Sequence, residues 1–282
     1  MSMMQNGGSR EESLMVSRAL KYASTADERQ TPMFLPFTDE HTMSVLEDAL
    51  KREHMNNYFI YGGWEEAERC VLGFFPYSML ESDDEDHTVI KSCFPITWLA
   101  VNTGGYGEIG HRDCLGSFLA SGIKREVLGD ILTSSGVSFE CSEGGKRNEK
   151  ISAYVAVFDM NSMASYISES ITSVGRTHVT LSPLSPEDIP SFVRQYDRIL
   201  VPVSSLRLDC VVAELTGLSR SDSKELILRG LVSVDHAPLT RPDRQLSENS
   251  VISVRGYGKF RFSSVVGSTK RDRLRTEFLK YK

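Results

Sequence analysis

The stretch from residue 205 to residue 262 constrains the fold most, because two helical patterns are followed directly by two extended ones. Apolar residues that recur every three or four positions predict the first helix, namely Leu208, Val211, Val212 and Leu215. Ser219 with Asp222 three residues later is a capping-box arrangement, which predicts that a second helix begins near Arg220. β-branched runs at 231–234 and 251–254 predict two strands. The expected structure is two short helices facing a small sheet.

Two short helices facing a small sheet, with Arg207 and Arg220 at the helix starts, resemble the S4 domain, an RNA-binding module of the αL type. Directly after the first strand, where S4 domains usually carry an Asn-Gly or similar hairpin turn, this chain has Asp235-His236. Histidine is a poor residue for a tight primed turn, so we expect a longer loop through Pro238. The resemblance covers residues 204–282 and implies that this domain binds RNA.

Several basic residues of this domain are candidates for contact with RNA phosphates. An arginine at a helix start can offer its guanidinium group together with the exposed backbone amides. The candidates are Arg207 and Arg220 at the helix starts, Lys224 one turn later, Arg255, Lys259 and Arg261 along the last strand, and Lys270, Arg271 and Arg273 in a basic tail expected to order only on RNA. For Arg207 the alternative is a salt bridge to a local carboxylate, and Ser219 is interpreted as a helix cap.

The distribution of charge favours the same end of the chain. The formal net charge is -6, yet the residues from 205 onward carry 15 Lys and Arg against 9 Asp and Glu, whereas the residues before them carry 17 against 29. Clustered cations gain affinity for a polyanion by releasing its counterions. A solvated charged surface remains the alternative interpretation of this surplus.

Residues 93–182 read as strand, helix, two strands, helix, strand, which is the ferredoxin-like order of RNA-recognition motifs. Trp98, Tyr154 and Phe158 lie on predicted strands without an aromatic-rich RNA-binding signature, so we expect them in the core. Arg112, Lys124 and Arg125 flank the first helix and are candidates for a second basic surface. Residues 93–182 therefore form an expected RRM-like domain.

The residues Gly105 to Gly110 match the G-x-G-x-x-G pattern of a dinucleotide-binding turn between a strand and a helix. A dinucleotide fold needs further parallel strand–helix units, and the following segment reads instead as a hairpin. We expect a flexible glycine loop, near RNA backbone, and no cofactor. The His111-Arg112-Asp113 triplet has no partner that would complete a known catalytic set.

The pattern of residues 1–92 predicts an N-terminal α/β domain. Residues 1–10 have the composition of a disordered segment, and a helix capped by Thr38 is expected after them.

Prolines at 183, 186 and 190 predict a linker over 183–203. The 5 cysteines are widely spaced, which indicates packed thiols in a reducing compartment and no metal site. No apolar run approaches the roughly 20 residues of a membrane span.

Five short segments and the S4-like region together resemble the bacterial YlmH family: GGWEEAER at 62–69, FFP at 74–76, HRDCLGS at 111–117, GIKRE at 122–126 and GDIL at 129–132. The resemblance runs over nearly the whole chain. It implies an α+β protein of three domains that associates with the large ribosomal subunit. It also implies a non-catalytic part in handling stalled, tRNA-bearing complexes.

We therefore expect a cytoplasmic RNA-binding protein that is not an enzyme and is monomeric away from the ribosome. It docks on structured ribosomal RNA through its S4 domain, and its other domains touch either tRNA or ribosomal protein. The alternative is an RNA-modifying enzyme, of the pseudouridine synthase or methyltransferase type, that its S4 domain delivers to RNA. A third alternative is an assembly adaptor that binds only protein.

Overall fold

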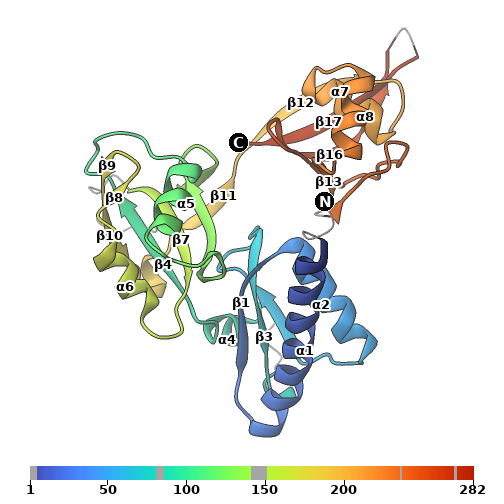
Figure 1. Ribbon diagram of the computed structural model, residues 1–282. Coiled ribbons are helices and arrows are strands. Elements are labelled where there is room, and N and C mark those ends of the chain that lie inside the picture. The colour runs from blue at the N-terminus through green and yellow to red at the C-terminus, as the bar shows by residue number, and fades with distance from the viewer. Residues whose placement is uncertain (1–4, 81–85, 141–150, 236, 270–271) are drawn as a thin grey trace. The chain divides into compact units, whose positions relative to one another are not determined.

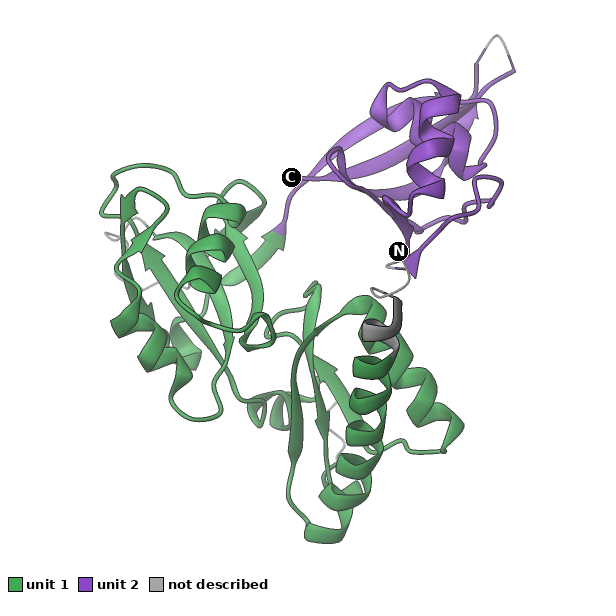
Figure 2. Ribbon diagram, in the orientation of Figure 1, with its two compact units in different colours: residues 1–193 green, residues 194–282 purple. Residues whose placement is uncertain are grey.

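The computed structural model describes residues 5–80, 86–140, 151–235, 237–269 and 272–282 (Figure 1). The chain divides into two compact units, residues 1–193 and residues 194–282, which Figure 2 colours green and purple. We refer to them as unit 1 and unit 2. Among the described residues, no helix combines the length and the apolar character needed to cross a membrane.

Unit 1 begins with a three-stranded antiparallel sheet in the order β1-β3-β2, covered on one face by two helices. Leu46 and Leu50 of the second helix pack with Leu35 and Leu72 of the strands, and all four are fully buried. The elements are α1 (Gln5–Arg29), β1 (Met33–Asp39), α2 (Glu40–Arg52), β2 (Tyr58–Tyr61), β3 (Arg69–Phe74), α3 (Tyr77–Leu80) and α4 (Thr88–Ser92).

Unit 1 continues with a four-stranded antiparallel sheet in the order β10-β4-β7-β5. Its element order is strand, helix, two strands, helix, strand, as the hydrophobic pattern predicts. The elements are β4 (Ile96–Asn102), α5 (His111–Ala120), β5 (Leu128–Thr133), β6 (Val137–Glu140), β7 (Ile151–Phe158), α6 (Met163–Ser170), β8 (Ser173–Val174), β9 (Thr177–His178) and β10 (Thr180–Pro183). Every neighbouring pair of strands is antiparallel, so the turn at Gly105 is not part of a parallel dinucleotide-binding sheet.

The two faces of this sheet are both buried. Helices α5 and α6 cover one face, where Phe118 and Ile167 pack on the strands. The other face packs in a second core with residues of the first sheet and of β11 (Ser191–Arg194), in which Phe192 lies 4.7 Å from Trp98 and 5.3 Å from Tyr154 between ring centroids. Trp98 and Tyr154 are buried, which confirms that they are core residues. RNA-recognition motifs stack bases on this face of the sheet, and here it is already covered.

Unit 2 has a six-stranded sheet in the order β12-β17-β16-β15-β13-β14 with two helices on one face. Leu208, Val212 and Ile227 of the helices are fully buried against Phe260 and Phe262 of the sheet. The elements are β12 (Tyr196–Val203), α7 (Leu208–Thr216), α8 (Arg220–Leu228), β13 (Val232–Val234), β14 (Ala237–Pro238), β15 (Val251–Val254), β16 (Gly258–Ser268) and β17 (Leu274–Tyr281). The two expected helices are confirmed.

The expectation of a linker over residues 183–203 was wrong for most of its length. Tyr196–Val203 is strand β12, which pairs with β17 in continuous antiparallel register. Val201 and Val203 alternate toward the core, whereas Pro202 is tolerated because β12 lies at the edge of the sheet. The chain does not end in a free tail after Arg273, because strand β17 starts at Leu274 and buries Phe278.

Three local expectations were also wrong. The Asp39 carboxylate, rather than the Thr38 hydroxyl, caps α2 by accepting from the Thr42 amide at 2.8 Å, since Thr38 still belongs to β1. Helix α1 begins at Gln5, inside the segment expected to be disordered. Pro238 lies in strand β14 and pairs with Ser233, so it is not part of a longer loop, and Asp235 is in the left-handed region at φ 49°.

Candidate functional site

The starts of α7 and α8 bring the strongest predicted residues together. Arg207 is the residue that precedes α7, and Arg220 is the first residue of α8. The Ser219 hydroxyl accepts a hydrogen bond from the Asp222 amide at 3.1 Å, which confirms the predicted cap and fixes where α8 begins. Lys224 follows Arg220 by one helical turn and therefore lies on the same side of α8.

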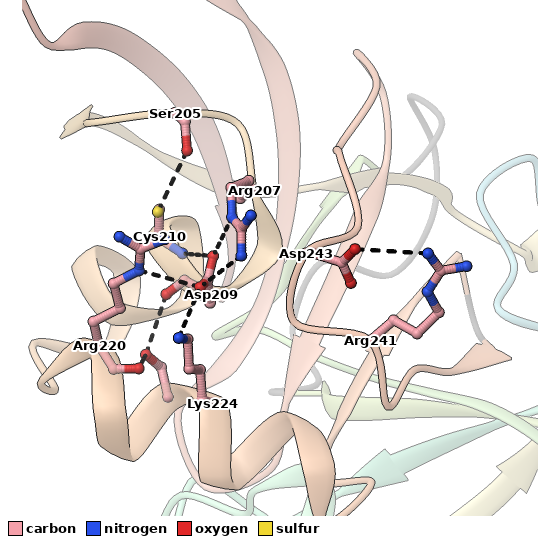
Figure 3. Close-up of polar contacts among 9 residues, drawn as sticks. Ser205, Arg207, Asp209, Cys210, Arg220, Lys224, Arg241 and Asp243 are labelled. Atoms are coloured by element: carbon pink, nitrogen blue, oxygen red, sulfur yellow. Dashed lines mark hydrogen bonds and ion pairs between the residues drawn. The ribbon is translucent and has the colours of Figure 1, made fainter.

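These three cations converge on one carboxylate, that of Asp209 (Figure 3). Arg207 Nε lies 3.1 Å from Asp209 Oδ1, and Arg220 Nε lies 3.1 Å from Asp209 Oδ2. Lys224 Nζ lies 3.9 Å from Asp209 Oδ2. We call Arg207, Asp209, Arg220 and Lys224 the Asp209 cluster. The salt bridge considered as the alternative role of Arg207 is therefore present.

Exposure differs sharply within the Asp209 cluster. The side chain of Asp209 is 0% exposed, whereas those of Arg207, Arg220 and Lys224 are 35%, 54% and 47% exposed. The single negative charge is hidden beneath three cations that reach solvent. The cluster therefore presents a positive surface, with a buried carboxylate that holds the cations in place.

Electrostatic shifts agree with this arrangement. Burial alone would raise the pKa of Asp209, but the hydrogen bonds from Arg207 and Arg220 outweigh it and lower the pKa from 3.8 to about 2. The hydrogen bond to Asp209 raises the pKa of Arg207. Asp209 and Arg207 therefore both carry their full charges at neutral pH.

The sequence reasoning missed both Asp209 and the loop beside it. Residues 241–246 run along the start of α7, where the Leu208 amide donates to the Arg244 carbonyl at 2.8 Å and the Leu246 amide donates to the Leu206 carbonyl at 2.9 Å. This loop carries two exposed arginines, Arg241 and Arg244. An acidic residue two positions after Arg207 and the sequence RPDR at 241–244 were the available signals.

Lys259 and Arg261 lie on the other face of the unit 2 sheet. They alternate along β16 with Phe260 and Phe262, which face α7 and α8. Lys259 Nζ lies 5.0 Å from the centroid of the Tyr281 ring, and the Arg261 guanidinium lies 5.0 Å from that of Tyr196. Arg255 is exposed in the turn between β15 and β16. The structure thus separates these cations from the Asp209 cluster.

The remaining candidates are dispersed. Arg273 forms an ion pair with Glu214 of α7. Arg112 is exposed in the first turn of α5, and Lys124 is exposed 3.9 Å from Glu126. Arg125 is half-buried and donates to the Leu128 carbonyl at 2.8 Å, and burial lowers its pKa to about 10. Lys270 and Arg271 lie outside the described residues.

The chain is similar to one protein family and to two named proteins. Residues 96–143 match the family profile described as "Putative RNA-binding domain in YlmH". A relative from Bacillus subtilis (strain 168), "Ribosome-associated protein quality control protein P2", is 24% identical over 274 residues, which cover 97% of this chain and 96% of that protein. The solved structure of "Cell division protein ylmH from Streptococcus pneumoniae" is 15% identical, with a TM-score of 0.42, and the match covers 62% of this chain and 92% of that one.

The profile match lies in the four-stranded part of unit 1, and the match to the Bacillus subtilis protein extends over nearly the whole of both chains. Together with the family resemblance in the sequence, these matches support the similarity of the chain to the YlmH family.

Proposed function

We propose that this protein is a non-catalytic, cytoplasmic RNA-binding protein that docks on structured RNA of the large ribosomal subunit and also contacts tRNA. Unit 2 is the S4 domain that makes the principal contact. Residues 93–182 form the RRM-like domain, and residues 1–92 form the N-terminal α/β domain. The observation that carries the proposal is the Asp209 cluster, with three solvent-reaching cations held above one buried carboxylate.

The geometry of the Asp209 cluster suits the phosphates of folded RNA. Nε of each arginine is directed to Asp209. Since a guanidinium group has five N–H donors, other donors remain for phosphate oxygens. The shared carboxylate restricts the rotamers of both arginines before RNA binds, so less side-chain entropy is lost on binding. A preformed group of cations recognises RNA by shape rather than by base sequence.

Two further observations support a ribosomal partner. The relative from Bacillus subtilis is named as ribosome-associated, and the matched profile is described as an RNA-binding domain. The surplus of basic over acidic residues is confined to the C-terminal part of the chain, which contains the Asp209 cluster. The residues before 205 have a surplus of acidic side chains, which RNA phosphates would repel, so unit 2 makes the first contact with RNA.

The experiment is co-sedimentation with purified large ribosomal subunits. The double variant Arg207→Ala with Arg220→Ala should lose most of the bound fraction, because two cations at helix starts are removed. Arg207→Lys with Arg220→Lys should bind at an intermediate level, because charge is kept and the guanidinium forks are lost.

The matched control is Arg29→Ala with Arg52→Ala, which changes the charge equally on exposed helix residues of unit 1. Circular dichroism should show every variant folded. Wild-type binding should fall with salt at a log–log slope of about -4 to -5 if about six phosphates are contacted. Unchanged co-sedimentation of the first double variant would contradict the proposal.

A further inference from the structure

Unit 1 contains a hollow of about 580 Å³ at one end of its four-stranded sheet. It lies between the loop that follows β4 and the segment that runs from β9 into β10, elements that Figure 1 shows together at this end of the sheet. Sites for small organic ligands usually measure about 300–1,000 Å³. The hollow is therefore large enough for a ligand of nucleotide size.

The first wall is the glycine loop that the sequence pattern singled out. Gly104 and Gly107 have φ of 63° and 81°, which favours glycine at both positions. The Gly104 amide donates to Asn102 Oδ1 at 2.7 Å, and the Tyr106 amide donates to the Thr103 carbonyl at 3.1 Å. A side chain at Gly107 would also meet Thr177 Oγ1 at 3.1 Å. The loop is bent sharply by its glycines, and its backbone hydrogen bonds hold Tyr106 at the edge of the hollow.

The chemistry of the lining fits a nucleotide. Tyr106 is 82% exposed, so its ring is available to a ligand from solvent. The opposite wall supplies Arg176 and His178, and none of the described residues that line the hollow is acidic. Thr103, Thr177 and Thr180 add hydroxyl groups that can donate or accept hydrogen bonds. An aromatic face, a guanidinium group and several hydroxyls are the groups that bind unstacked RNA bases and their phosphates.

We propose that this hollow binds one unstacked nucleotide of single-stranded RNA, with the base on the Tyr106 ring and the phosphate near Arg176. The assignment deepens the proposed function and rests on it. It places the contact at the end of the sheet, because Phe192 packs on Trp98 and Tyr154 and covers the sheet face that RNA-recognition motifs use. Unit 1 then contacts single-stranded RNA, and the Asp209 cluster contacts folded RNA.

The test measures fluorescence anisotropy of the full chain with two labelled RNAs, a single-stranded octanucleotide and a hairpin. Tyr106→Ala should weaken octanucleotide binding at least about 5-fold, because stacking of one base on an aromatic ring contributes about 1–3 kcal/mol. Tyr106→Phe should bind as wild type, since the ring is kept. Arg176→Ala should also weaken binding. The control is Tyr166→Ala, which removes a tyrosine 55% exposed on α6 and should change nothing.

Tyr106→Ala leaves the net charge unchanged, so an effect cannot come from general attraction to phosphates. Wild-type affinity for the octanucleotide in both Tyr106→Ala and Arg176→Ala would overturn the assignment. So would Tyr106-dependent binding of free uridine or adenosine monophosphate without binding of the octanucleotide. If the wild-type chain binds the hairpin but not the octanucleotide, only the assignment of a nucleotide to the hollow is wrong. If it binds neither RNA, the proposed function is wrong as well.

Discussion

Each unit contains a buried aspartate with hydrogen-bond donors around it, but the donors are buried in unit 1 and reach solvent in unit 2. In unit 1, Asp130 is 8% exposed and accepts hydrogen bonds from the Trp64 indole at 2.9 Å and from the Glu68 and Arg69 amides at 2.9 and 3.0 Å. In unit 2, Asp209 is 0% exposed and accepts from Arg207 and Arg220, whose side chains reach solvent. The Asp130 carboxylate holds buried groups together inside unit 1, whereas the Asp209 carboxylate positions cations on the surface of unit 2.

The pKa shifts of the neighbouring arginines record this difference. Burial lowers the pKa of Arg69, whose guanidinium donates to the Leu128 and Phe37 carbonyls inside unit 1. The hydrogen bond to Asp209 instead raises the pKa of Arg207. An arginine near a buried carboxylate is therefore a candidate for binding RNA only when its remaining donors face solvent. By this criterion Arg125 belongs with Arg69, because it also donates to the Leu128 carbonyl.

The largest expected effect comes from removing the interior carboxylate. Asp130→Ala should lower the free energy of unfolding of unit 1 by about 2–4 kcal/mol, because an indole and two backbone donors lose their acceptor in a buried site. Urea denaturation followed by tryptophan fluorescence measures this, since Trp64 and Trp98 both lie in unit 1. Asp48→Ala, at an exposed position, is the control and should change stability little. Equal stability of the two variants would break the comparison.

A smaller effect is expected from pH acting on Asp209. Its pKa is lowered from 3.8 to about 2, so the stabilisation is complete above the ordinary value and is lost as pH falls through about 2. The loss is at most about 2 kcal/mol, because the partners are partly exposed and screened by solvent. Asp209→Asn should remove this part of the pH dependence. The measurement is chemical denaturation of unit 2 between pH 6 and pH 2, monitored by tyrosine-sensitive near-ultraviolet circular dichroism.

In that series, parallel curves for the wild type and Asp209→Asn would show that the carboxylate does not stabilise the Asp209 cluster. Asp243→Asn is the matched control, because Asp243 is exposed beside the same cluster and pairs with Arg241 at 3.6 Å (Figure 3). The control should keep the wild-type acid dependence.

The smallest effect is expected on the opposite face of the unit 2 sheet. Lys259→Ala should weaken binding to a folded RNA by no more than about threefold, because it removes one half-buried charge away from the Asp209 cluster. Lys224→Ala, which removes the same charge from the cluster, should weaken binding more. Filter binding at two salt concentrations compares them. If Lys259→Ala is the more damaging change, the sheet face rather than the helix starts makes the main contact.

Local patterns predicted the parts of the fold in which neighbouring residues decide the structure. Residues close together in the sequence decide three of these features: the cap at Ser219, the apolar face of α7 and the strand at 58–61. Tyr196–Val203 and Leu274–Tyr281 were missed because prolines and cations obscured an alternation that matters only once the two strands pair. Their partners are about 80 residues apart in the chain, and a local pattern does not contain that pairing.

The sequence by itself determined that two short helices near the C-terminus begin at arginines and that Ser219 caps the second, because caps, helical periodicity and charge are local properties. Only the tertiary structure decided what those arginines do. Packing of α7 against α8 places Arg207 and Arg220 around Asp209, and the alternation of β16 directs Lys259 to the other side of the sheet. Which donors reach solvent depends on the burial of groups distant in sequence, so exposure could be assigned only after the chain had folded.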